Sequence, residues 1–493
     1  MGHATFVLVV PFLGALLVGL FGRGASRARS LALVTSFASF LAAVALWAAF
    51  DSDRTGYQLV ESAAWIPSLG ASFLFGVDAL GLLFVVLTAF VAPLAILGNW
   101  DRIALGARGH YCTLLILEAA LFGVFLAIDV LLFYTFLLLS LVCLGLLMSF
   151  AGGTNGARVT LRFWTLTMGA SLLLLTVFTM CYHIHTIQSG APSFDGRHWV
   201  DLVLSPDTEV WLFWASFVAL GLLVPLMPMH FWLQGSVQEA PLAGRVFLCA
   251  VLVKVGVFGL FRFIIPWFPR AAHTYAPLIL TLAMVSVIYG ALTLMFESDF
   301  ARVLARVTAI YMGLAALGLF SFHTDGVKGS IFLMLSHGLF ITAWFAWMGM
   351  LEKRGWHGQV PELIGLKGSM RWGAGVLTLL SAAAICVPAF GSFVGLFLIA
   401  RGSLASKISL HALGAGVGLL LMAVVFLKVA RKALARKGDR ELKDLLGWEV
   451  LVLLPMILLV IWMGVRPGVL LRHLDGATDG FISRVAEAML LTD

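Results

Sequence analysis

The sequence contains few charged residues. Asp, Glu, Lys and Arg together make up only 12% of its 493 residues, whereas an ordinary soluble domain has roughly 25%. Hydrophobic residues make up 61% and recur in long runs along the whole chain. This composition excludes an ordinary soluble fold and predicts a polytopic membrane protein.

Cysteine is also scarce and is never clustered. The five cysteines stand singly in apolar segments, with no CxxC pair, whereas zinc and iron–sulfur ligation need grouped cysteines. The sequence has no flavin- or nucleotide-binding motif. We therefore expect no cofactor, no metal site and no catalytic redox centre in this chain.

The apolar runs predict an all-α membrane fold. A helix needs about 20 apolar residues to cross the hydrocarbon core, and about fourteen such segments are separated by short polar stretches. We expect short strands only at residues 57–60 and 73–75. Residues 469–493 are too mixed in composition to span the membrane, and they predict an interfacial helix.

Basic residues gather in alternate loops, beginning with Arg23, Arg27 and Arg29 after the first apolar segment. Because basic loops favour the cytoplasmic side, this alternation predicts that both termini face outside. The formal net charge of +7 therefore reflects membrane orientation, and we expect no nucleic-acid partner.

Lys254 lies in the middle of an apolar segment. Residues 246–253 and 255–261 on its two sides carry no formal charge, which places the ammonium near mid-membrane if the segment spans. A lysine there can snorkel to an interface or pair with a neighbouring helix. Because ionisable groups at this depth are costly and usually functional, Lys254 is a candidate proton carrier.

Two apolar segments are interrupted by helix-breaking residues. His230, Glu239 and Pro241 precede the lysine segment, so a break, a titratable side chain and an acid lie close together. Pro388 and the glycines after it interrupt residues 373–400. Paired interrupted helices in the two halves of a membrane chain indicate an antiporter-like or transporter-like inverted repeat.

Three further ionisable residues lie in or beside apolar segments. Glu118 lies inside the segment that begins at Cys112, where a carboxylate needs a partner or a proton. Asp129 separates two adjacent helices, as a helix cap or interface residue does. His337 either donates to a carbonyl or relays protons. With Lys254, His230 and Glu239, these residues are the proton-path candidates.

Several stretches resemble a known family. FLFGVDALGLLFVVLTAFVAPLAIL is followed, in the family's order, by MPMHFWL, EAPLAG, LVKVG, SDFARVLA, MLSHGL and VPAFGSFVG. The chain is thus similar to the antiporter-like subunits of respiratory complex I, the NADH:quinone oxidoreductase family, and most to its subunit M branch, the counterpart of mitochondrial subunit 4. In that family a lysine at the position of Lys254 exchanges protons through internal water, and His337 matches the SHG histidine.

The resemblance implies partners and cofactors outside this chain. It implies other membrane-arm subunits, membrane lipid and a bacterial inner membrane, with quinone, FMN and iron–sulfur clusters in partner subunits. It also implies four parts: N-terminal helices (1–110), a first repeat with Lys254 (111–265), a second repeat with the Pro388 break (266–405) and C-terminal helices (406–493). Similar chains occur in cation/proton antiporters, membrane-bound hydrogenases and inorganic-carbon uptake complexes, so these remain alternatives.

Three positions depart from the family pattern. Leu138 in FLLL replaces the glutamate of an FWEL-like motif, Ala301 replaces the lysine of DLKR, and Leu396 replaces the acid of a GFVGEF-like motif. None of these side chains can carry a proton. The chain therefore either takes part in proton translocation by another path or is a non-conducting structural variant.

Overall fold

The computed structural model describes residues 2–98, 100, 103, 106–150, 155–435 and 442–490, which are mostly helical. The first part contains α1 (His3–Phe21), α2 (Ala25–Ala49), β1 (Gln58–Ile66), η1 (Pro67–Leu69), β2 (Ala71–Val77) and α3 (Ala79–Gly98). The middle part contains α4 (Ala107–Leu126), α5 (Val130–Ser149), α6 (Gly156–Ser189), η2 (His198–Asp201), α7 (Pro206–Leu223), α8 (Phe231–Glu239), α9 (Leu242–Phe247), η3 (Leu248–Leu252), α10 (Val253–Gly259), η4 (Leu260–Ile264) and α11 (Ile265–Trp267). The last part contains α12 (Pro269–Leu294), α13 (Phe300–Leu319), α14 (Thr324–Glu352), η5 (Val360–Leu363), α15 (Leu366–Ser369), α16 (Arg371–Ala384), α17 (Gly391–Ala405), α18 (Ser409–Leu434), α19 (Gly447–Val465) and α20 (Gly468–Leu490).

The described helices account for the predicted membrane crossings. Twelve of them are long and apolar enough to cross a membrane, with α9 to α11 counted as one. Two further crossings are interrupted, because α7 and α8 are separated by residues 224–230 and α16 and α17 by residues 385–390. Twelve single helices and two interrupted pairs thus confirm the predicted all-α polytopic fold and both of its discontinuous helices.

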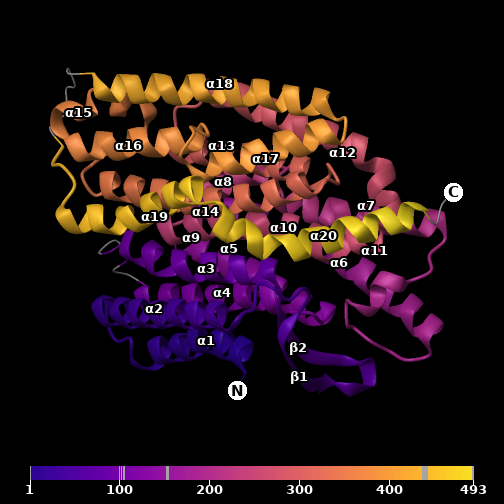
Figure 1. The fold of residues 1–493 in the computed structure, drawn as a ribbon. Coiled ribbons are helices and arrows are strands. Elements are labelled where there is room, and N and C mark those ends of the chain that lie inside the picture. Colours follow the sequence, from indigo (N-terminus) through magenta and orange to yellow (C-terminus); the bar gives the residue numbers. More distant parts are fainter. Residues whose placement is uncertain are drawn as a thin grey trace.

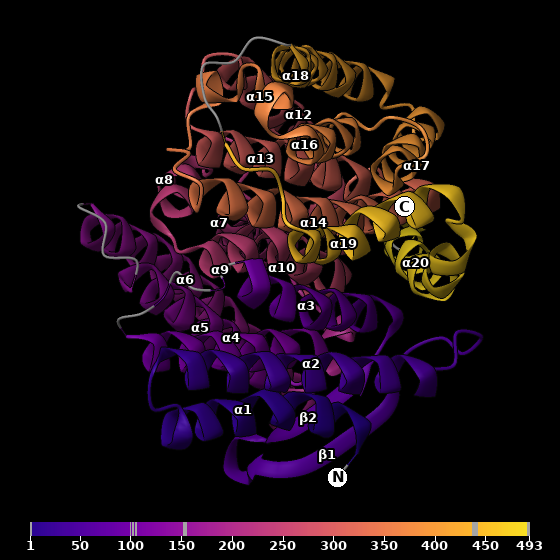
Figure 2. The same cartoon turned by 90° about the vertical axis from the view of Figure 1, so that its left-hand side faces the viewer.

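The long helices lie side by side in one bundle. In Figures 1 and 2, α1 and α2 lie at one edge, α18 lies at the opposite edge, and α14 lies between them. The most apolar window of α14 is 100% buried, and α14 packs against α3, α13, α17 and α19. A helix that is apolar on all sides must be enclosed by other helices, which explains why α14 forms the centre.

The connection between α2 and α3 forms an antiparallel hairpin, β1–β2, which lies beside α1 (Figure 1). The predicted strands are confirmed, but both are longer than the sequence indicated. Gly70 occupies the turn with a φ of 66°, where glycine avoids the strain of a Cβ atom. A Cβ atom there would also lie 2.0 Å from the Pro192 carbonyl oxygen, so the turn packs tightly on a later loop.

One helix is longer than its apolar run predicts. The apolar run of residues 161–181 predicts a helix of that extent, but α6 runs from Gly156 to Ser189, so His183 and His185 lie on its last turns. No group of three or more possible metal ligands occurs among the described residues. The expected C-terminal helix is present as α20, where the Asp475 carboxylate pairs with the Lys328 ammonium of α14 at 2.6 Å.

We predict that a side chain at Gly395 destabilises the bundle. A Cβ atom there would lie 2.8 Å from the Leu333 Cα atom of α14, so Gly395→Val should lower the free energy of unfolding by about 1–3 kcal/mol through overpacking. Thermal unfolding of the detergent-solubilised chain measures this. Gly375→Val is the matched control, because nothing lies within 4 Å of a Cβ atom at Gly375; equal melting temperatures would contradict the prediction.

Candidate functional site

Lys254 lies in a helical segment that contains two π-helical turns. η3 ends directly before α10, and η4 follows α10. A π turn carries an extra residue, and such turns are frequent at functional sites. The fully buried Lys254 Nζ donates to the Cys249 carbonyl oxygen at 2.8 Å, five residues earlier in the chain. The first π turn thus supplies one partner of the ammonium.

The second partner of Lys254 is His337, on the central helix α14. The distance between Lys254 Nζ and His337 Nδ1 is 3.0 Å, and both residues are 0% exposed. Since both side chains are bases, one of the two nitrogens must accept this hydrogen bond. The pair therefore holds at most one positive charge in this geometry.

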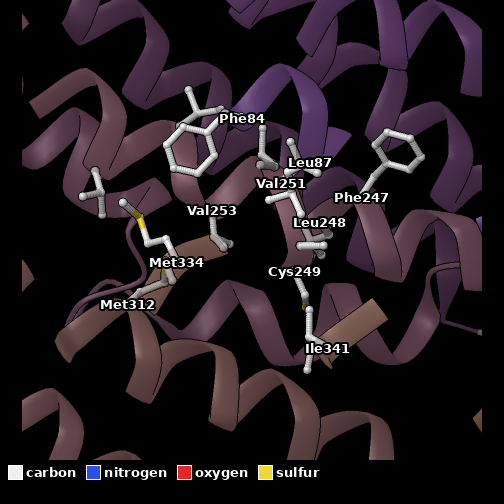
Figure 3. Packing of buried hydrophobic residues seen from close by; sticks show 14 of the residues in the cluster. Phe84, Leu87, Phe247, Leu248, Cys249, Val251, Val253, Met312, Met334 and Ile341 are labelled. Atoms are coloured by element: carbon white, nitrogen blue, oxygen red, sulfur yellow. The ribbon is translucent and has the colours of Figure 1, made fainter. Parts of the chain in front are cut away.

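No carboxylate neutralises this charge within the described part of the chain. No Asp or Glu oxygen there lies within 4.0 Å of Lys254 Nζ. Figure 3 shows apolar side chains of α3, α13 and α14, including Phe84, Met312 and Met334, packed around residues 248–253. A charge in such surroundings is costly unless it is paired. The hydrogen bonds to His337 and to the Cys249 carbonyl oxygen therefore replace most of the hydration that the ammonium loses on burial.

Tyr311 links this pair to the second interrupted helix, and the sequence reasoning missed it. The Tyr311 ring centroid lies 4.9 Å from that of His337. Its hydroxyl donates to the Ala384 carbonyl oxygen at 2.8 Å and lies 3.3 Å from Cys386 Sγ, in the break between α16 and α17. A single tyrosine in an apolar run carries no spacing or charge signal, so only the packing reveals this contact.

Glu118 and Asp129 lie away from the Lys254–His337 pair. Glu118 is 1% exposed on α4, beside the Ser39 hydroxyl, which itself donates to the Thr35 carbonyl oxygen. Asp129 Oδ1 accepts from Leu132 N at 3.0 Å and caps α5, while Oδ2 accepts from the Ser72 N–H at 2.9 Å. Asp129 therefore has the geometry of the cap and interface residue that the sequence indicated.

His230 and Glu239 flank α8. The His230 ring packs against the Tyr289 ring with centroids 5.2 Å apart, and both line a small cavity together with Ser286 and Arg306. Glu239 is the last residue of α8. Among the described residues, only Lys254 and His337 of the candidates are joined by a hydrogen bond.

Comparison with known proteins shows the family of this chain. The profile of the family described as "NADH:quinone oxidoreductase/Mrp antiporter, TM" matches residues 127–423, which include both interrupted helices and the Lys254–His337 pair. The chain belongs to this family. The sequence had indicated both interrupted helices from the helix-breaking residues within the apolar segments.

Members of the family resemble the chain over nearly its full length. NADH-ubiquinone oxidoreductase chain 4 of Arabidopsis thaliana is 32% identical over 97% of this chain and 96% of its own. NADH-quinone oxidoreductase subunit M of Rickettsia prowazekii is 29% identical over 95% of this chain and 96% of its own. A chain of respiratory complex I from Thermus thermophilus, solved with bound NADH, superposes with a TM-score of 0.89 at 28% identity and covers 98% of this chain and 99% of its own.

The three departures from the family pattern lie on separate helices. Leu138 is half-buried on α5, Ala301 is buried on α13, and Leu396 is half-buried on α17. Each presents an alkyl side chain at a position where the resemblance implies a titratable one. The chain therefore has a buried lysine and histidine in contact but no titratable side chain at these three positions.

Proposed function

We propose that the chain is an M-type membrane-arm subunit of a quinone-linked NADH dehydrogenase, packed among other membrane-arm subunits in a bacterial inner membrane. The proposal is supported by the near-complete coverage of relatives named subunit M or chain 4. Quinone, FMN and iron–sulfur clusters then belong to partner chains. Both termini face outside, as the basic loops predict.

We further infer that this subunit does not relay protons along the family's usual route. The observation that carries this inference is the surroundings of Lys254, whose partners are a carbonyl oxygen and an imidazole. A proton that leaves the pair needs a titratable group or water within hydrogen-bond reach, whereas Leu138, Ala301 and Leu396 supply only alkyl groups. The contribution of the subunit to proton translocation is then architectural.

Replacing Lys254 with alanine in the assembled complex tests this inference. The expected result is an unchanged number of protons pumped per electron pair in sealed vesicles, because the residue does not belong to a continuous path. Lys428→Ala is the matched control, since Lys428 is exposed on α18 and undergoes the same chemical change. Subunit content and electron-transfer rate are measured in the same preparations.

A lower pumping ratio in Lys254→Ala, with normal assembly and an unchanged ratio in Lys428→Ala, would overturn the architectural role. Lys254 and His337 would then work in a rerouted path, with Glu118, Asp129, Glu239 or His230 as its next members. Substitution of each of these residues would identify which one carries the proton.

The second candidate function is that of a membrane subunit in a cation/proton antiporter, a membrane-bound hydrogenase or an inorganic-carbon uptake complex. The family description supports this second candidate function, because the description names Mrp antiporters beside the oxidoreductases. Purification in mild detergent, followed by identification of the associated chains, separates the two. Flavin and iron–sulfur chains support the first function, whereas antiporter subunits or a carbonic-anhydrase-like chain support the second.

A further inference from the structure

A cavity of about 180 Å³ lies between α6, α8 and α13. Arg162 of α6 and Arg302 of α13 line it together with the aromatic and small residues of α8, and none of its lining residues is acidic. Its volume is several times the roughly 30 Å³ that one water takes up in the liquid. Two cations and no carboxylate make this cavity suited to an anion.

Both guanidinium groups keep hydrogen-bond donors free for a ligand. Arg302 Nε donates to Gln238 Oε1 at 2.8 Å, and its two terminal nitrogens make no hydrogen bond to a described residue. The Arg162 guanidinium carbon lies 5.1 Å from the Phe231 ring centroid, a cation–π contact that holds the group without using its donors. The cavity is therefore partly preorganised for a group that accepts several hydrogen bonds.

The position of the cavity indicates the source of the anion. Arg162 and Arg302 lie near the starts of α6 and α13, at the end of the bundle that the basic loops predict to be cytoplasmic. Phe231, which lines the cavity, is 45% exposed, so one side of the rim is apolar. An apolar rim beside paired arginines matches a phospholipid better than a free anion, because basic pockets between helices on this side bind lipid head groups.

We propose that this cavity binds the phosphate group of an anionic phospholipid. Arg162 and Arg302 donate to the phosphate oxygens, for which the planar guanidinium fork is well matched. The acyl chains lie along the exposed Phe231 side chain. The bound lipid contacts α6, α8 and α13 together. It therefore stabilises the position of α8, which is the second half of the first interrupted helix.

Retention of phosphatidylglycerol by the purified full chain tests the proposal. The chain is reconstituted in phosphatidylcholine with a minor fraction of phosphatidylglycerol, extracted into mild detergent and examined by native mass spectrometry. We expect the affinity to fall roughly fivefold for each arginine removed, so Arg162→Gln with Arg302→Gln should lose one tightly held anionic lipid per chain. Arg472→Gln with Arg484→Gln, at two exposed positions of α20, is the charge-matched control and should retain that lipid.

A second variant leaves every charge in place. A Cβ atom at Gly235 would meet only the Val159 methyl groups, at 3.8 and 4.0 Å, so the side chain of Gly235→Leu can extend into the cavity and exclude the head group. It should lose the same lipid as the double arginine variant. If the arginine variant does not fold, Gly235→Leu alone decides the outcome.

Three results would overturn the proposal. Equal retention of phosphatidylglycerol by the wild type and Gly235→Leu would show that the cavity does not hold the lipid. Displacement of the lipid by millimolar inorganic phosphate would show a site for free anions. Co-purification of an acidic protein segment that cross-links to the cavity, with no lipid retained, would assign the cavity to a protein partner.

Discussion

Replacing Arg262 with glutamine is expected to lower the free energy of unfolding by about 3–5 kcal/mol, because it leaves a charge unpaired inside the bundle. The Arg262 guanidinium pairs with the Asp78 carboxylate at the start of α3. It also donates to the Phe125 carbonyl oxygen at 2.7 Å, and it lies 4.4 Å from the Phe258 ring centroid. The loss of these contacts affects α3, α4 and the lysine-bearing segment together.

Denaturant or thermal unfolding of the detergent-solubilised chain measures this effect. Arg484→Gln, at an exposed position of α20, is the matched control and should change stability by less than about 0.5 kcal/mol. Adding Asp78→Asn to Arg262→Gln should recover part of the loss, since it removes the unpaired charge. A single Arg262→Gln variant as stable as the wild type would mean that the ion pair contributes nothing to the fold.

The stability of the connection between α4 and α5 should fall as the pH rises through about 6. Burial raises the pKa of Asp129 from 3.8 to about 6, although hydrogen bonds from Ser72 N and Leu132 N favour the ionised form. The native state therefore binds the Asp129 proton more tightly than the unfolded chain does. The resulting stability is fully present below pH 3.8 and is lost above about pH 6, and a shift of this size corresponds to about 3 kcal/mol.

Unfolding of the wild type and of Asp129→Asn between about pH 3.5 and about pH 7.5, a range that brackets the shift of the pKa, isolates this contribution. Asparagine caps helices about as well as aspartate and does not titrate, so the variant should lack the decrease between pH 4 and 6. Other carboxyl groups affect both proteins equally. Parallel pH profiles for the two proteins would mean that Asp129 ionises normally in the folded chain.

The crossings and their interruptions were predictable because each depends on local composition. A bilayer leaves no water for backbone groups, so long apolar runs must become helices. The break before α8 and the break at residues 385–390 follow from proline, glycine and polar residues within such runs. The extent of α6 was less predictable, because its last turns are polar and their helical conformation depends on contacts outside the segment.

By itself, the sequence determined that Lys254 and His337 lie in apolar helices, since neighbouring residues along the chain set the depth of a side chain in the membrane. Only the tertiary structure decided which side chain pairs with each buried basic group. Arg262 meets the carboxylate of Asp78, 184 residues away, whereas Lys254 meets His337, 83 residues away, and no carboxylate of the described chain. The physical reason is that partners of buried groups come from helices distant in sequence, and the close packing of those helices sets which side chains lie within hydrogen-bond reach.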